Sequence, residues 1–199
     1  MGKREQNAQE TRVAILETAD RLIAERGYEQ ISVEEITRTA GIAKGTFYNY
    51  FKKKEDLIRA LYHAHFAVLN DRIPALAEGA AVESLTRYLD EFAAVIEAAG
   101  AMQAREWARY MLLGQEGRSK WEDDTETLAG LIRRLQEHGQ IVSTASADEL
   151  AAVLMTQIYG IVFLWGIHPT RSPRMQVQEF CRVYLPALIT PHLPEHCNG

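Results

Sequence analysis

The sequence predicts an all-α protein, and three observations lead to this prediction. Apolar residues recur with the 3.6-residue period of an α-helix along most of the chain, and no segment alternates with period two over a useful length. Residues 32–54 have the pattern of two short helices joined by a tight turn. Residues 150–167 form an almost uninterrupted apolar run, which is typical of a helix that is covered on all sides.

Composition and charge indicate a globular protein with a difference between its two ends. The 199 residues are 47% hydrophobic and 25% charged, with a formal net charge of −5. Residues 1–60 contain 11 Lys and Arg against 10 Asp and Glu, whereas the remaining residues contain 11 against 17. An acidic total argues against a protein coated with nucleic acid. Contact with a polyanion is therefore expected only at the N-terminal end.

The N-terminal end also bears on location. Lys3 and Arg4 are followed by polar residues rather than by an apolar run, so no stretch resembles a signal peptide. The two cysteines, Cys181 and Cys197, imply no disulfide framework, and a buried free thiol at Cys181 is the default interpretation. We therefore expect a cytoplasmic protein.

Three helices are expected in the first 53 residues. The first covers about residues 9–26, where apolar residues recur at helical period. Ser32 and Glu35 have the spacing of a capping box at the start of the second helix. Gly41 ends that helix, because the residue past a helix end often needs a positive φ. The third helix follows at about residues 43–51.

The third helix has an apolar face and a polar, cationic face. At 100° per residue, Phe47 and Phe51 point toward the second helix, whereas Gly45 and Asn49 point the opposite way. Residues 41–54 contain four lysines and no acid. Such a helix suits the major groove of DNA, where polar side chains read bases and cations approach phosphates. A plain helical hairpin with a solvated basic face has the same pattern, so these residues alone leave both interpretations open.

About residues 10–58 resemble the DNA-binding domain of the TetR family of repressors. The resemblance rests on the run Gly-Ile-Ala-Lys-Gly-Thr-Phe-Tyr-Asn-Tyr-Phe-Lys-Lys-Lys-Glu-Asp-Leu, with Ile15-Leu16-x-x-Ala19 and Arg26-Gly27-Tyr28 upstream. It implies an N-terminal three-helix helix-turn-helix DNA-binding domain in residues 1–53. It also implies a C-terminal helical effector-binding and dimerisation domain in residues 54–199.

The resemblance implies a DNA-binding role for the outward face of the third helix. Lys44, Gly45 and Tyr48 are expected to face bases, because a glycine lets the backbone approach the floor of the groove. Phosphate contacts are expected from a hydroxyl group or a cation at other positions of the motif. The full expected set of DNA-binding residues is Ser32, Lys44, Gly45, Thr46, Tyr48, Asn49, Tyr50 and Lys54.

The rest of the chain is predicted to be helical as well. A long helix at about residues 54–72 follows the third helix almost without a gap, so it is the natural lever behind the DNA-binding domain. Ser146 and Glu149 repeat the capping-box spacing at the start of a later helix. The further helices are expected at about residues 82–98, 101–113, 121–138, 146–167 and 173–189.

The apolar helix that ends near residue 167 predicts a dimer. Its length approaches that of a membrane span, but the acidic residues Asp148 and Glu149 at its start favour a buried helix of a soluble protein. A second copy of the chain is the economical cover for its outer face, and the resemblance implies a four-helix dimer interface here. The expected interface residues are Leu154, Ile158, Gly160, Ile161, Val177, Phe180, Cys181 and Tyr184.

Large aromatic and flexible apolar residues are frequent in the middle of the chain. Each of them alone is best interpreted as core, but together they also suit a pocket with polar tips. The resemblance implies an effector pocket formed by the middle helices, for a small hydrophobic or amphipathic molecule. The expected lining residues are His65, Phe66, Tyr88, Phe92, Trp107, Tyr110, Met111 and Gln157.

Catalytic and metal-binding signatures are weak. The sequence contains no nucleophile elbow, no phosphate-binding glycine loop and no His-Glu-x-x-His, so we expect neither an enzyme nor a cofactor. His192, His196 and Cys197 crowd the C-terminal tail, but a fourth ligand is missing and no metal site is expected.

Our hypothesis is a homodimeric, ligand-responsive repressor that binds a near-palindromic operator. An effector would shift the lever helix and thereby change the separation of the two DNA-binding domains. Two alternatives stay open. The chain could be an architectural or protein-partnered DNA-binding protein without a small-molecule switch, or a helical ligand carrier whose basic motif is incidental.

Overall fold

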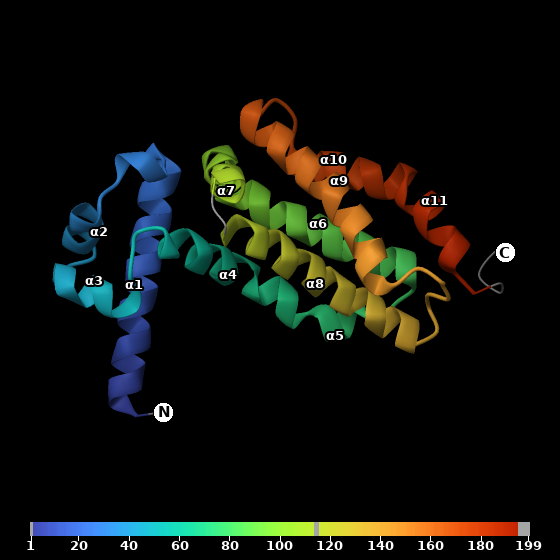
Figure 1. Ribbon diagram of the computed structural model, residues 1–199, viewed down its shortest axis with the longest axis horizontal. Helices are drawn as coiled ribbons and strands as arrows, with labels where there is room; N and C mark the ends of the chain where they lie inside the picture. The colour runs from blue at the N-terminus through green and yellow to red at the C-terminus, as the bar shows by residue number, and fades with distance from the viewer. Residues whose placement is uncertain (1, 114–115, 195–199) are drawn as a thin grey trace. The chain divides into compact units, whose positions relative to one another are not determined.

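The computed structural model in Figure 1 describes residues 2–113 and 116–194, with the side chains of residues 2–109 and 120–194. Helices account for almost all regular structure in these ranges, and they contain no strand. The predicted all-α class is therefore confirmed. The chain divides into two compact units, Met1–His65 and Phe66–Gly199. The functional division after residue 53 stays a prediction.

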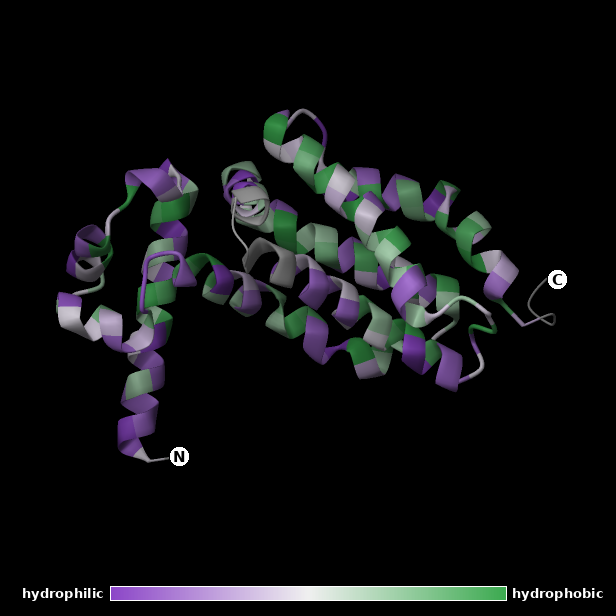
Figure 2. Ribbon diagram, in the orientation of Figure 1, coloured by the Kyte–Doolittle hydropathy of each residue, from purple (hydrophilic) through white to green (hydrophobic). Residues whose placement is uncertain are grey.

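The N-terminal unit is built from three helices and the beginning of a fourth. Ile15, Ala19 and Ile23 are completely buried and lie at intervals of four residues, so they form one face of the first helix. This helix begins six residues earlier than the apolar period predicted, since its first turns are hydrophilic (Figure 2). The elements are α1 (Lys3–Arg26), a 3-10 turn (Tyr28–Gln30), α2 (Val33–Thr39), α3 (Lys44–Tyr50) and the start of α4 (Asp56–Asp71).

The caps of α2 hold the motif in shape. Ser32 Oγ accepts a hydrogen bond of 3.1 Å from the backbone N–H of Glu35, as predicted. The Glu35 carboxylate does not return to the cap; it accepts a 2.7 Å hydrogen bond from Arg26. The predicted capping box is therefore wrong in its second half, because a cation competes for the carboxylate. Gly41 has a φ of 69°, which confirms its role in the turn.

The C-terminal unit is a bundle of helices. The last predicted helix, residues 173–189, is wrong as a single element: it breaks at Tyr184, because Pro186 has no N–H to donate and its ring would clash with the preceding turn. The elements are the end of α4, then α5 (Ile73–Leu76), α6 (Ala81–Ala99), α7 (Ala101–Leu113), α8 (Glu116–Glu137), α9 (Ala147–Ile167), α10 (Pro173–Val183), α11 (Leu185–Ile189) and a 3-10 turn (Thr190–His192).

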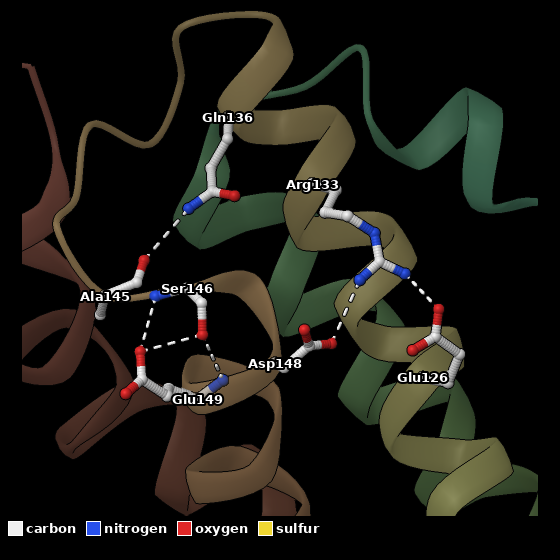
Figure 3. A network of polar contacts seen from close by, with 7 residues as sticks. All are labelled: Glu126, Arg133, Gln136, Ala145, Ser146, Asp148 and Glu149. Carbon is white, nitrogen blue, oxygen red and sulfur yellow. Dashed lines mark hydrogen bonds and ion pairs between the residues drawn. The ribbon is translucent and has the colours of Figure 1, made fainter.

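The start of α9 is fixed by a complete capping box and by an ion pair to α8 (Figure 3). Ser146 Oγ accepts from the N–H of Glu149 at 3.2 Å, and the Glu149 carboxylate accepts from the N–H of Ser146 at 2.8 Å. The predicted capping box is confirmed here. Arg133 on α8 forms an ion pair with Asp148 at 3.1 Å and another with Glu126. These polar contacts define where the apolar helix begins.

Helix α9 lies at the centre of the C-terminal unit and packs against α6, α7, α8 and α10. Ala151, Met155 and Ile158 are completely buried by these neighbours. Among the described residues α9 is the one helix long and apolar enough to cross a membrane, and 44% of its most apolar stretch is buried inside the unit. Its packing against four helices is that of a core helix with one face left uncovered.

Phe47 and Tyr48 are adjacent residues of α3 that test the two faces of this helix. Phe47 is completely buried and Tyr48 is 46% exposed. We expect Phe47→Ala to destabilise the N-terminal unit by about 3–5 kcal/mol, because it removes a buried aromatic ring. The control Tyr48→Ala should cost far less. Urea denaturation with hydrogen exchange of the α1–α3 amides measures both, and equal losses would contradict the assigned orientation of α3.

Candidate DNA interface and effector pocket

The outward face of α3 is the first candidate site. Four residues that were predicted to contact DNA are exposed there: Lys44, Gly45, Tyr48 and Asn49. Phe51 and Phe47 are buried on the opposite side and their rings lie 5.5 Å apart. The apolar side chains thus fix α3 to the N-terminal unit, and the polar tips remain accessible.

Lys44 forms an ion pair with Glu34 across the turn between α2 and α3. The hydrogen bond from Lys44 lowers the pKa of Glu34, and the same contact raises the pKa of Lys44. Both side chains are more than half exposed, at 52% and 64%, so the pair contributes little to stability. Lys44 can therefore exchange Glu34 for a more strongly acidic partner at little cost.

Gly45 lies inside α3 without any packing reason for a glycine. A Cβ atom at this position would meet nothing within 4 Å, and the residue is exposed. Gly45 is the second residue of α3, and glycine in a helix costs up to about 1 kcal/mol relative to alanine. The fold of the free protein does not account for this glycine. Close approach of another molecule to the α3 backbone would account for it.

Not all of the other predicted DNA-binding residues are equally accessible. Thr46 and Tyr50 are half-buried, and Ser32 is exposed while its hydroxyl caps α2. Lys54 is held inside the unit: its Nζ donates to the backbone oxygen of Tyr28 at 2.6 Å and lies 3.9 Å from the centre of the Tyr28 ring. The phosphate contact predicted for Lys54 thus requires it to leave Tyr28.

Two further cations close to α3 were left out of the predicted set. Lys52 and Lys53 follow α3 directly and both are exposed. The charge run after Phe51 was visible in the sequence, but it gave no way to tell which of the three lysines folds back onto the unit. Lys52 and Lys53 add to the cationic character of this side of the motif.

The second candidate site is a small cavity inside the C-terminal unit. Its volume is about 20 Å³, which is room for about one water molecule. Helices α6 and α7 contribute Phe92, Ile96, Ala104, Trp107 and Ala108 to its wall. Helices α8 and α9 contribute Lys120, Tyr159, Val162 and Phe163. A molecule larger than water can enter only if some of these side chains move.

A buried polar cluster forms one end of the cavity. Lys120 Nζ donates to Asp124 Oδ2 at 2.9 Å and to Tyr159 Oη at 2.6 Å, and the Tyr159 hydroxyl donates to Asp124. Burial raises the pKa of Asp124 to about 8, lowers the pKa of Lys120 well below its usual value and raises the pKa of Tyr159. The cluster joins α8 to α9 by charged groups that are almost fully removed from water.

The structure brings some of the predicted pocket residues together. Phe92 and Trp107 line the cavity. Phe66 and Tyr88 are buried behind it, with their rings 4.6 and 6.3 Å from the Phe92 ring. The predicted roles of Tyr110 and Met111 concern side chains that lie outside the described residues.

Like Phe66 and Tyr88, two further predicted pocket residues do not line the cavity. His65 Nε2 lies 3.1 Å from Asp20 Oδ1 in the N-terminal unit. Gln157 is exposed on α9. The aromatic composition that suggested the pocket carried no information on which face of a helix each residue occupies, so the structure places both residues away from this cavity, and their role in effector binding stays a prediction.

Lys120, Asp124 and Tyr159 were missing from the predicted site. A signal for two of them was present, because Lys120 and Asp124 continue the buried stripe of Leu128 and Leu135 on α8 at helical spacing. A charged pair that falls on an apolar stripe is a candidate functional feature. The residues were overlooked because charged side chains are usually solvated.

The predicted dimer-interface residues need a correction. Six of the eight are buried by the chain's own helices and are not available to a second copy: Leu154, Ile158, Ile161, Val177, Phe180 and Cys181. Gly160 and Tyr184 are exposed. The exposed apolar side chains of α9 are instead Val153, Phe163, Leu164 and Ile167. The reason is that α6, α7, α8 and α10 cover the face of α9 that the prediction assigned to a partner.

Within the described part of the chain, no group of three or more His, Cys, Asp or Glu residues is placed to hold a metal ion. His196 and Cys197, two of the tail residues with metal-binding chemistry, lie outside that part. Cys181 is buried, and burial raises the pKa of its thiol to about 11.

Comparison with known proteins identifies the N-terminal motif. Residues 15–61 match the sequence model of a family described as bacterial regulatory proteins, tetR family. The N-terminal helix-turn-helix region of the chain is that of the TetR family. The matched residues contain α2 and α3 and the second half of α1. The TetR family resemblance drawn from the sequence is thus confirmed.

Relatives and solved structures extend this likeness over most of the chain. The chain is 28% identical over 182 residues to the HTH-type transcriptional repressor DhaR of Mycobacterium sp. strain GP1, covering 88% of this chain and 90% of DhaR. It also resembles the crystal structure of a TetR-family transcriptional regulator from Mesorhizobium loti, with a TM-score of 0.72, 20% identity and coverage of 94% and 98%.

A third similar protein carries a ligand. The Thermus thermophilus repressor FadR, solved in complex with lauroyl-CoA, has a TM-score of 0.70 and 22% identity, with coverage of 86% of this chain and 92% of FadR. At this level of identity the two solved structures establish the fold of the chain.

The buried pair Lys120–Asp124 gives a test of the polar cluster. We expect Lys120→Met or Asp124→Leu alone to destabilise the protein by about 3–5 kcal/mol, because each leaves one buried charge without its partner. The double variant should be considerably more stable than either single variant. Chemical denaturation of the four proteins measures this coupling. A double variant that loses the sum of the two single losses would contradict an interacting pair.

Proposed function

We propose that the chain is a ligand-responsive transcriptional repressor that binds a near-palindromic DNA operator as a homodimer. A small hydrophobic or amphipathic effector enters the C-terminal unit and releases the operator. The protein acts in the cytoplasm and performs no catalysis. The TetR-family helix-turn-helix region and the likeness of most of the chain to a transcriptional repressor support this proposal.

The accessible α3 face carries the DNA-binding part of the proposal. Exposed Lys44, Tyr48 and Asn49 surround a glycine that the fold itself does not require. Lys44 and Tyr48 supply donors and an apolar ring edge for base recognition. Lys52 and Lys53, together with the remaining predicted residues, supply phosphate contacts.

The uncovered face of α9 supports the homodimer. Val153, Gly160, Leu164 and Ile167 are exposed at intervals of seven, four and three residues, which is one side of a helix. A Cβ at Gly160 would meet nothing within 4 Å, so this glycine also has no packing role inside the chain. A stripe of exposed apolar residues on a core helix marks an interface. We propose that the interface uses this stripe rather than the buried residues first predicted.

The cavity between α6, α7, α8 and α9 supports the effector site. It is enclosed mainly by apolar side chains and ends at a buried polar cluster, which is the usual composition of a ligand pocket. Similar solved structures hold acyl-CoA ligands: lauroyl-CoA in Thermus thermophilus FadR and stearoyl-CoA in Bacillus subtilis FadR. An effector of this chain would move side chains of α9 and thereby reach the dimer face.

Gly45→Ala tests the DNA interface directly. The variant should fold at least as well as the wild type, since alanine favours a helix and its Cβ has free space. It should nevertheless weaken operator binding by at least about tenfold, or 1.4 kcal/mol, because the methyl group keeps the backbone from the groove. Fluorescence anisotropy with DNA from upstream of the protein's own gene measures the affinity.

Gly130→Ala is the matched control for this test. Gly130 also lies inside a helix, α8, and a Cβ there would also meet nothing within 4 Å. The control should bind the operator as the wild type does. If Gly45→Ala binds as tightly as Gly130→Ala, α3 does not approach DNA closely and the proposed interface is wrong.

Leu164→Lys tests the proposed dimer face. Leu164 is 61% exposed, so a lysine there costs the isolated chain little, but it would bury a charge without a partner in an interface. We expect the variant to sediment as a monomer and to lose operator affinity. Val68→Lys is the control, because Val68 is 72% exposed on α4. Dimers of both variants in sedimentation equilibrium would exclude the α9 face.

A further inference from the structure

The polar end of the cavity is basic. Lys120 is the one charged side chain among the described residues that line the cavity. Its partner Asp124 does not line it, although the two groups are hydrogen-bonded at 2.9 Å. Lys120 therefore borders the cavity, and Asp124 does not. A molecule in the cavity meets the positive member of the pair first.

Burial strengthens the preference of the cavity for an anionic ligand. The side chains of Lys120 and Asp124 are only 9% and 5% exposed, so water screens their charges weakly. A cationic ligand would be repelled by Lys120 and would have to lose its own hydration. A ligand anion would gain a charge-assisted hydrogen bond of the kind that is strongest away from water.

The remaining wall selects the body of the ligand. Phe92, Trp107 and Val162 are almost completely buried, and they offer ring faces and branched methyl groups. Phe163 is different, because it is 40% exposed while it still lines the cavity. Phe163 is thus the most exposed of the lining residues, and moving it outward would break the fewest contacts.

We propose that the effector is a small organic acid with an apolar, ring-sized body, whose carboxylate accepts hydrogen bonds from the Lys120 ammonium group. The body packs between Phe92, Trp107 and the displaced Phe163. This inference rests on the proposed function, because it takes the cavity to be the effector site.

The cluster also has a way to tolerate the added negative charge. Burial raises the pKa of Asp124 to about 8, so near neutral pH this carboxyl group can hold a proton and need not place a second negative charge beside the ligand carboxylate. Lys120 then pairs with the ligand instead of with Asp124. Tyr159, which bridges the two groups from α9, keeps its hydroxyl beside Lys120 in either state.

Matched probes test the charge preference on the full-length wild-type protein. Benzoate, cinnamate and 2-naphthoate are each compared with the primary amide and the primary amine of the same skeleton by isothermal titration calorimetry. We expect at least one acid to bind, and to bind at least tenfold more tightly than its amide and its amine. The proposal is overturned if no acid binds, or if every acid binds no better than its amide or amine.

Two variants show whether Lys120 causes the preference. The double variant Lys120→Met with Asp124→Leu removes both charges, so it avoids a lone buried carboxylate. It should lose the tenfold preference for the acid and keep the affinity for the amide. Arg133→Met is the control, because Arg133 is another cation of α8 that pairs with Glu126 and Asp148 outside the cavity. An acid preference that persists in the double variant would overturn the assignment.

Operator binding is measured separately on the unliganded wild type, so the two proposals fail in different ways. Acid preference without operator binding would disprove the repressor function and leave the ligand assignment standing. Operator binding without acid preference would disprove the ligand assignment alone.

Discussion

Helix α9 is apolar almost all round, and the C-terminal unit is arranged to cover it. Four helices bury Ala151, Leu154, Met155 and Ile158 among other residues, and the cap at Ser146 gives the helix a hydrophilic start. Each apolar side chain that is covered stabilises the fold through the hydrophobic effect, but a single copy of the chain leaves one face of α9 exposed. The proposed dimerisation and the position of the cavity both depend on this one helix. The cavity lies on its covered side, and the proposed interface lies on its open side.

Polar groups inside this apolar unit are costly, which makes the cluster of Lys120, Asp124 and Tyr159 informative. Burying charges removes their hydration, and their mutual attraction only partly compensates. An apolar trio of similar volume would hold α8 to α9 at least as well. The cost of burying the charged cluster suits the role we propose for it beside the cavity, which is recognition of a ligand. The same helix carries Tyr159 toward the cavity and Leu164 toward the open face, so a ligand contact at one side is close to the dimer contact at the other.

Much of the N-terminal unit could be predicted from the sequence because apolar and polar residues fall on opposite sides of its helices. Phe47 and Phe51 are buried and Gly45 and Asn49 are exposed, as a 100° rotation per residue requires. The same rule failed on α9. A helix that is apolar on all sides has buried and exposed faces of the same composition, so the sequence does not distinguish them. The prediction therefore chose Leu154, which the chain buries, and missed Leu164.

Contacts between residues far apart in the chain could not be predicted from the sequence, for a different reason. His65 pairs with Asp20, which is 45 residues away, and Lys54 folds onto Tyr28. The spacing of residues along one helix carries no information about such partners. The cavity shows the same limit, because four separate helices supply its wall.

The number of chains on one DNA duplex tests the central claim most directly. Sedimentation velocity with two wavelengths follows a fluorescein-labelled duplex from upstream of the gene together with the unlabelled wild-type protein. A homodimeric repressor that reads two half-sites predicts that the duplex sediments with two chains, or with a whole number of pairs. A duplex that carries a single chain, or that sediments free at saturating protein, would contradict it.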